Sequence, residues 1–188
     1  MMNYEIIYNY LKENLEDKRF IHTMGVVSTA KKLANLYGVD EKRAEIAALC
    51  HDICKNLSNE ELLEIFKNNN IELSISEKNT QTLWHSIAAP IVAKEKFNIN
   101  DEEILGAMRW HTTGKLSMTK LEKIIYIADM IEPSRRFDGV EEIREAVLKD
   151  LDSGVLIGVN HTIRYLLDRG NLIDENTIAF RNGLILNL

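Results

Sequence analysis

A histidine and an aspartate lie side by side, as His51 and Asp52, within the otherwise apolar segment AALCHDICK. Burying an imidazole and a carboxylate without partners costs roughly several kcal/mol. A divalent cation bound by both side chains would offset that cost, so the pair predicts a metal site. Mixed imidazole and carboxylate ligands favour iron, manganese, cobalt or zinc over the all-oxygen sites of calcium and magnesium.

Two cysteines, Cys50 and Cys54, flank this pair. A helix would place both thiols on one face, where a disulfide is not expected. A soft-metal site with His51 is the alternative interpretation, but the ligand spacings of zinc sites are absent. We therefore interpret both cysteines as small buried hydrophobic residues.

The chain has 188 residues, of which 45% are hydrophobic and 28% charged, as is typical of a globular protein. This length suits a single domain over residues 1–188. The net charge of −6 argues against a broad surface for nucleic acid, because phosphate backbones are bound by clustered Lys and Arg. The sequence has no apolar run of membrane-spanning length and no signal-peptide pattern, so we expect no membrane partner and a cytoplasmic location.

Apolar residues recur at helical spacing along the chain, whereas alternating strand patterns are scarce. The sequence therefore predicts an all-α fold, a bundle of about eight to ten helices. Helix starts are predicted at Asp40, Asn100, Ser58 with Glu61, and Thr119 with Glu122. We further expect the helix after Asp40 to continue into His51 and Asp52, another to be interrupted or kinked near Pro90, and a last long helix over residues 152–168.

The C-terminal segment is moderately apolar and is expected to pack on the domain, because its large apolar residues would not be left in water. These residues are Ile178, Phe180, Leu184 and Leu186. Trp84 and Trp110, which each precede a histidine, are interpreted as core residues that hold that histidine in place.

Four of the five histidines lie at the ends of separate predicted helices or on apolar helix faces: His22, His51, His85 and His111. Asp129 borders the inner stripe of a further predicted helix. The fifth histidine, His161, lies among polar residues and is interpreted as a solvated or core-edge residue. The four histidines and the two aspartates are therefore the candidates for one site.

The segments RFIHTMGV, CHDICK, WHSIAAP, WHTTG and YIADMIEPSRRFDGV, in this order, resemble the signature of the HD-domain phosphohydrolases. Within that superfamily they are similar to the bacterial YqeK-type enzymes, symmetrical bis(5'-nucleosyl)-tetraphosphatases that bind iron. The resemblance implies a metal-site core at residues 19–136 with residues 140–188 packed on it. It further implies one or two metal ions and cleavage of diadenosine tetraphosphate to two ADP. A homodimer remains possible.

The resemblance assigns the first metal ion to His22, His51, Asp52 and Asp129. Asp52 has two oxygens, so it could bridge to a second ion approached by His85 and His111. A metal-bound water loses its proton near neutral pH, and the resulting hydroxide can attack phosphorus. Asp52 is interpreted as a ligand that also orients this water. His85 and His111 remain open as phosphate binders, second-metal ligands or acid catalysts.

Residues beside these ligands are candidates for binding the substrate. Arg135 follows Asp129 across a proline-containing turn, and a guanidinium matches phosphate oxygens in a bidentate fork. The neighbouring Arg136 is interpreted as solvated. The full predicted substrate-binding set is Arg19, His22, Lys55, His85, His111, Thr112, Gly114, Asp129 and Arg135. None of these residues is assigned to adenine, and the AFRN segment near the C-terminus is a candidate for binding it.

Two alternatives to this function remain open at the level of sequence. Many HD domains act on other nucleotides, and the motif alone does not exclude these substrates. A nucleotide-sensing module could also keep the metal pocket without hydrolysing its ligand. Such modules usually lack one essential ligand, whereas all six positions are filled here, which favours an enzyme.

Overall fold

The computed structural model describes residues 4–187, which form eleven α-helices and one short 3-10 helix with no strand. The predicted all-α fold is confirmed, and the helix number exceeds the expected range by one. The helices are α1 (Tyr4–Asn14), α2 (Asp17–Tyr37), α3 (Glu41–Cys50), α4 (Asn59–Asn68), α5 (Ile75–Asn79), α6 (Trp84–Phe97), α7 (Glu102–Trp110), α8 (Lys120–Ile131), α9 (Val140–Lys149), α10 (Leu151–Asp168) and α11 (Glu175–Leu186).

Side-chain caps set the starts of several helices as expected. Ser58 and Thr119 each form a complete capping box, and the Asp40 carboxylate accepts hydrogen bonds from two backbone amides of α3. The start predicted at Asn100 is wrong by one residue. Asp101 caps α7 instead, because its carboxylate accepts from the amides two and three residues later, at 3.0 and 3.2 Å.

Three other expectations about helix extent need correction. Helix α3 ends at Cys50, so the pair His51 and Asp52 lies in the turns that follow the helix. Helix α6 runs through Pro90 without the interruption that was one of the two expectations there. The helix over residues 152–168 is present as α10, but α11 follows it.

The C-terminal helix α11 packs on the rest of the fold through one face only. Phe180 and Leu184 are buried as expected, at 1% and 8% exposure. Ile178 and Leu186 are exposed at 39% and 64%, so the expectation that they would be buried is wrong. The helical repeat turns them toward the outer face of α11.

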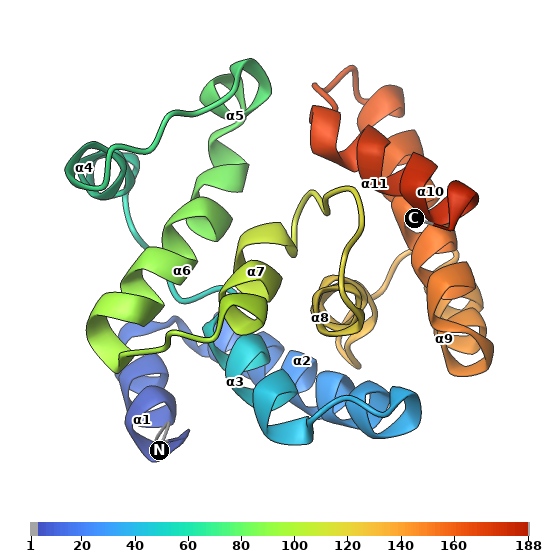
Figure 1. The fold of residues 1–188 in the computed structure, drawn as a ribbon, viewed down its shortest axis with the longest axis horizontal. Helices are drawn as coiled ribbons and strands as arrows, with labels where there is room; N and C mark the ends of the chain where they lie inside the picture. Colours follow the sequence, from blue (N-terminus) through green and yellow to red (C-terminus); the bar gives the residue numbers. More distant parts are fainter. Residues whose placement is uncertain (1–3, 188) are drawn as a thin grey trace.

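Helix α8 lies at the centre of the arrangement, between α2 and α7 on one side and α10 on the other (Figure 1). Helix α2 also packs against α3, and α6 packs against α7. Buried residues from α1 to α11 belong to one hydrophobic cluster. Helix α3 packs against α2, α7 and α8, so the turn that follows α3 lies among these helices. No helix within residues 4–187 combines the length and apolar character needed to cross a membrane.

Candidate metal centre

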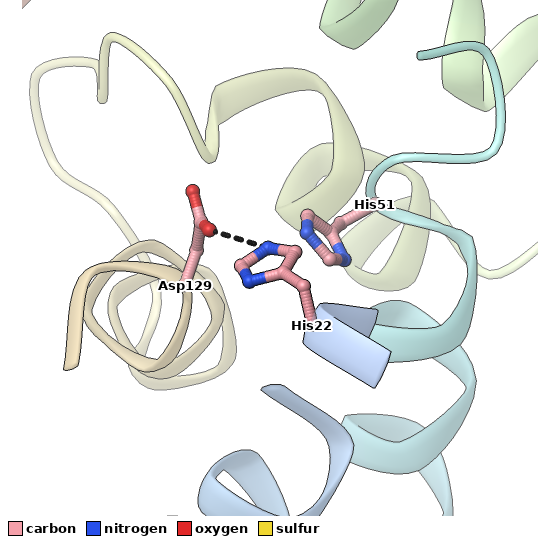
Figure 2. Close-up of side chains that lie close together, drawn as sticks. All are labelled: His22, His51 and Asp129. Atoms are coloured by element: carbon pink, nitrogen blue, oxygen red, sulfur yellow. Dashed lines mark ion pairs between the residues drawn. The ribbon is translucent and has the colours of Figure 1, made fainter. Parts of the chain in front are cut away.

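Six side chains from five segments converge beside α8. Figure 2 shows three of them, His22 from α2, His51 from the turn after α3 and Asp129 from α8, facing one another. The ligand atoms of these three residues all lie within 4.8 Å of one another. The structure therefore brings together the residue types that the sequence predicts for a metal site.

The free imidazole nitrogens of this group fit a cation. His22 Nε2 lies 3.0 Å from Asp129 Oδ1, but the direction of approach does not make a hydrogen bond. His51 Nε2 is also buried without a hydrogen-bond partner. A buried polar atom without a partner requires an explanation, and a divalent ion between these nitrogens and the carboxylate supplies one.

Backbone carbonyls set the tautomers of two imidazoles. His51 Nδ1 donates to the carbonyl of Ala48 at 2.6 Å, and His111 Nδ1 donates to that of Met108 at 2.8 Å. Each ring therefore presents its Nε2 lone pair to the cluster, the arrangement that metal-binding histidines use. Burial lowers the pKa of His51 to about 4, which keeps this ring neutral at neutral pH.

Glu132 fixes the third imidazole, and sequence reasoning missed it. Its carboxylate is 1% exposed, accepts from His22 Nδ1 at 3.1 Å, and accepts from the amide and hydroxyl of Ser134 at 2.7 and 2.5 Å. Gly25 makes room for it, because a Cβ atom at that glycine would lie 2.6 Å from Glu132 Oε2. The only signal in the sequence was a glutamate directly before Pro133, which also fits a simple helix end.

Asp52 lies between two sets of side chains, His85 and His111 on one side and Arg19 and His51 on the other. Its Oδ1 lies 3.1 Å from His85 Nε2 and 3.7 Å from His111 Nε2. Its Oδ2 lies 2.7 Å from Arg19 Nη1 and 3.5 Å from His51 Nε2. Burial alone would raise the pKa of Asp52, but the surrounding imidazoles hold it well below its usual value. The carboxylate is therefore ionised, and each of its oxygens faces one of these two sets.

A second group of possible ligands consists of His51, Asp52 and His111, again within 4.8 Å of one another. His51 is thus shared between the two groups, and His85 contacts the second group through Asp52 and His111. His85 Nε2 lies 3.2 Å from His111 Nε2, so one proton can lie between the two rings.

Three basic side chains border the cluster. Arg135 Nη2 lies 2.6 Å from Asp129 Oδ1, and Arg19 pairs with Asp52 as described above. Lys55 Nζ lies 3.4 and 3.3 Å from the two ring nitrogens of His85. Burial lowers the pKa of Lys55 and that of His85. Desolvation alone would raise the pKa of Asp129, but His22, His51 and Arg135 lower it well below its usual value.

Two other predicted substrate contacts differ in position. Thr112 lies at the edge of the cluster, where its hydroxyl is 3.0 Å from that of Ser86. The Gly114 amide donates to the carbonyl of Trp110 at 2.9 Å and is therefore not free to bind a phosphate. A Cβ atom at Gly114 would collide with the ring of Phe180, so this glycine serves close packing at a positive φ of 68°.

The remaining sequence interpretations concern packing. Phe180 of the AFRN segment is fully buried, so its ring is not available to stack on an adenine. Trp84 is a core residue as predicted, and its indole donates to the carbonyl of Glu77 at 2.7 Å. Cys50 and Cys54 are buried and free, and the metal-binding groups found in residues 4–187 contain no cysteine.

Comparisons with known proteins agree with this geometry. A family profile for the HD domain matches residues 19–134. The chain is 36% identical to the symmetrical bis(5'-nucleosyl)-tetraphosphatase of Bacillus subtilis, covering 98% of each chain. It is 35% identical to the protein of that name from Staphylococcus aureus, covering 96% of this chain and 94% of the relative.

A crystal structure from Clostridium acetobutylicum, described as that of a predicted HD-superfamily hydrolase involved in NAD metabolism, superposes with a TM-score of 0.95 at 43% identity. The match covers 100% of both chains. Fold, ordered histidines and aspartates, and full-length relatives agree, and the chain therefore belongs to the HD-domain family.

Proposed function

We propose that this chain hydrolyses diadenosine tetraphosphate at its centre and releases two ADP. The observation that carries the proposal is the cluster of four histidines and two aspartates bordered by three basic side chains, in a chain that aligns over nearly its whole length with proteins named for this activity. Hydrolysis of a phosphoanhydride needs a polarised phosphorus and neutralised oxygens, and this set of residues can supply both.

A divalent transition metal, with iron as the proposed identity and manganese, cobalt or zinc as alternatives, would be held by His22, His51, Asp52 and Asp129. Asp52 Oδ1 could extend the site to a second ion with His85 and His111. Bound at these residues, a metal ion supplies charge neutralisation and lowers the pKa of a water molecule. The neutral His51 ring and the two ionised carboxylates suit this role without a further change of protonation.

The basic residues would bind the polyphosphate chain. Arg19 and Arg135 pair with the two carboxylates, and a metal ion held by both carboxylates would offset their negative charge. The two guanidinium groups are then available to phosphate oxygens. Lys55 lies beside His85, and Thr112 lines a separate cavity that borders His111 and Asp129.

His85 and His111 would handle the proton. Their Nε2 atoms lie 3.2 Å apart and both face Asp52 Oδ1, so a proton held between them lies close to the ion site. Donation of that proton to the departing ADP oxygen would assist bond cleavage as general acid catalysis.

Product analysis tests the proposal directly. Protein purified without oxygen and supplied with Fe²⁺ is incubated with diadenosine tetraphosphate, and the nucleotides are separated. ADP as the sole product is expected. ATP with AMP, or no turnover, contradicts the proposal, and tight ADP binding without turnover would favour the nucleotide-sensing alternative. Ranking kcat/KM over a nucleotide panel that includes NAD⁺ tests substrate choice.

A further inference from the structure

A cavity of about 440 Å³ opens beside the metal centre. His111, Asp129 and Arg135 line one end of it, so the cavity begins at the candidate ligands and at one proposed phosphate contact. Phe137, from the loop before α9, and residues of α10 line the other end. A volume of this order falls within the range of small-molecule sites.

The far end of the cavity presents aromatic surface. The rings of Phe137 and His161 lie with their centroids 4.6 Å apart at an interplanar angle of 42°. Tyr165 lies one turn later on the same face of α10 as His161 and is 48% exposed. Three rings from two segments therefore border the same open space.

This aromatic end suits a neutral, flat group with polar edges. Asp129, at the metal end, is the only acidic residue in the cavity lining within residues 4–187. Tyr126 also lines the cavity but is 3% exposed, and its hydroxyl has the Thr162 side chain beside it.

A second cavity, which shares no lining residue with the first, lacks such surface. This smaller cavity, of about 290 Å³, begins at Lys55 and His85 and continues along Gln81 and Thr82. Apart from His85, its lining contains no aromatic ring in the part of the chain that the structure describes. The two approaches to the centre therefore differ in chemistry, although the proposed substrate has two identical halves.

We propose that Phe137, His161 and Tyr165 bind the nucleobase of one half of the dinucleotide by stacking, so that a symmetrical substrate is held asymmetrically. This inference rests on the proposed function. The base of this half lies in the aromatic end of the cavity. The phosphates attached to it pass Arg135 and reach the metal centre, and the other nucleoside extends toward Lys55. The first half anchors the substrate, and one ADP product dissociates from the aromatic end.

Binding of ADP and of inorganic diphosphate to the metal-loaded protein tests this assignment by calorimetry. Tyr165→Ala and Phe137→Ala are each expected to weaken ADP binding about tenfold, within the range for loss of one stacked ring. Diphosphate affinity should stay unchanged because no base is present. Tyr165→Phe should restore ADP binding, since the ring and not the hydroxyl stacks. Leu167→Ala, at a 62% exposed position of the same helix, is the control and should bind ADP normally.

The outcomes separate this inference from the proposed function. Wild type that cleaves diadenosine tetraphosphate to ADP, together with a Tyr165→Ala variant of unaltered ADP affinity and KM, overturns the base subsite and leaves the function intact. An equal loss of ADP and diphosphate affinity in Tyr165→Ala also overturns the subsite. If Tyr165→Ala loses affinity for ADP but not for diphosphate, and the wild type does not cleave diadenosine tetraphosphate, the subsite is supported and the proposed function fails.

Discussion

The two halves of the metal centre hold their histidines differently. On the side of α2 and α8, Glu132 is buried and fixes the His22 ring through Nδ1. On the side of α6, His85 has Lys55 near both ring nitrogens and the His111 ring beside its Nε2. A fixed tautomer suits a metal ligand, whereas a ring among other proton carriers suits proton transfer. We take this contrast as support for the proposal that the side of α2 and α8 binds the ion and that His85, on the side of α6, handles the proton.

Asp52→Ala should have the largest effect, because its carboxylate serves both halves. We expect kcat to fall at least about a thousandfold, since several kcal/mol of transition-state stabilisation are lost. Turnover of diadenosine tetraphosphate and metal content per chain are measured together. Asp138→Ala, at an exposed position, is the matched control. Activity within tenfold of wild type would show that the two halves do not depend on a shared carboxylate.

His85→Gln tests the side of the centre to which proton transfer is assigned. We expect kcat to fall about a hundredfold, the lower end of what general acid catalysis contributes, with metal content unchanged. Single-turnover rates and elemental analysis measure both quantities. Loss of metal in this variant would mean that His85 acts as a ligand, and the proposed division of labour would then be wrong.

Glu132→Gln tests the side of the centre to which ion binding is assigned. Loss of such a supporting carboxylate typically weakens metal affinity about 10- to 100-fold. We expect a loss of this size in a metal titration, with kcat at saturating metal close to that of wild type. Glu141→Gln, whose side chain is 76% exposed, is the matched control. Unchanged metal affinity would contradict the role given to the buried carboxylate.

Asp101→Asn should leave both halves intact and have the smallest effect. Arg43 pairs with Asp101 at 2.6 Å and lowers the pKa of this carboxyl, and the pair is about one-third exposed. We expect a loss of about 0.5–1 kcal/mol at neutral pH with normal turnover. A lowered folded pKa stabilises the fold above the ordinary carboxyl pKa of about 4, and this stabilisation is lost as pH falls through the folded pKa, so the difference should shrink below about pH 4. Urea midpoints at pH 7 and pH 3 measure it, and an equal difference at both would contradict the assignment.

Local signals in the sequence predicted the starts of three helices, α3, α4 and α8. The capping boxes at Ser58 and Thr119 depend on residues three positions apart, so neighbouring letters contain the information. The start of α7 was misplaced because Asn100 and Asp101 are both good caps, and the sequence does not choose between them. The end of α3 before His51 was missed because the following apolar residues continue the helical pattern.

Long-range contacts account for what sequence reasoning missed at the site. The cluster itself was predicted through its ordered motif, and the structure brings its members together. Glu132 and His22 are 110 positions apart, so their hydrogen bond leaves no local pattern. The aromatic end of the cavity joins a ring in the loop before α9 to rings on α10, which the sequence places among ordinary polar residues. Both features depend on tertiary packing.

Gly25 sets a limit on how this protein can be made more thermostable. Glycine inside a helix is about 1 kcal/mol less favourable than alanine, so replacing it is a usual first step in stabilising a helix such as α2. Here the added methyl group would displace the carboxylate that holds His22. Helix stability and metal affinity therefore compete for the same few cubic ångströms, and a more heat-resistant variant has to be sought at positions remote from this contact.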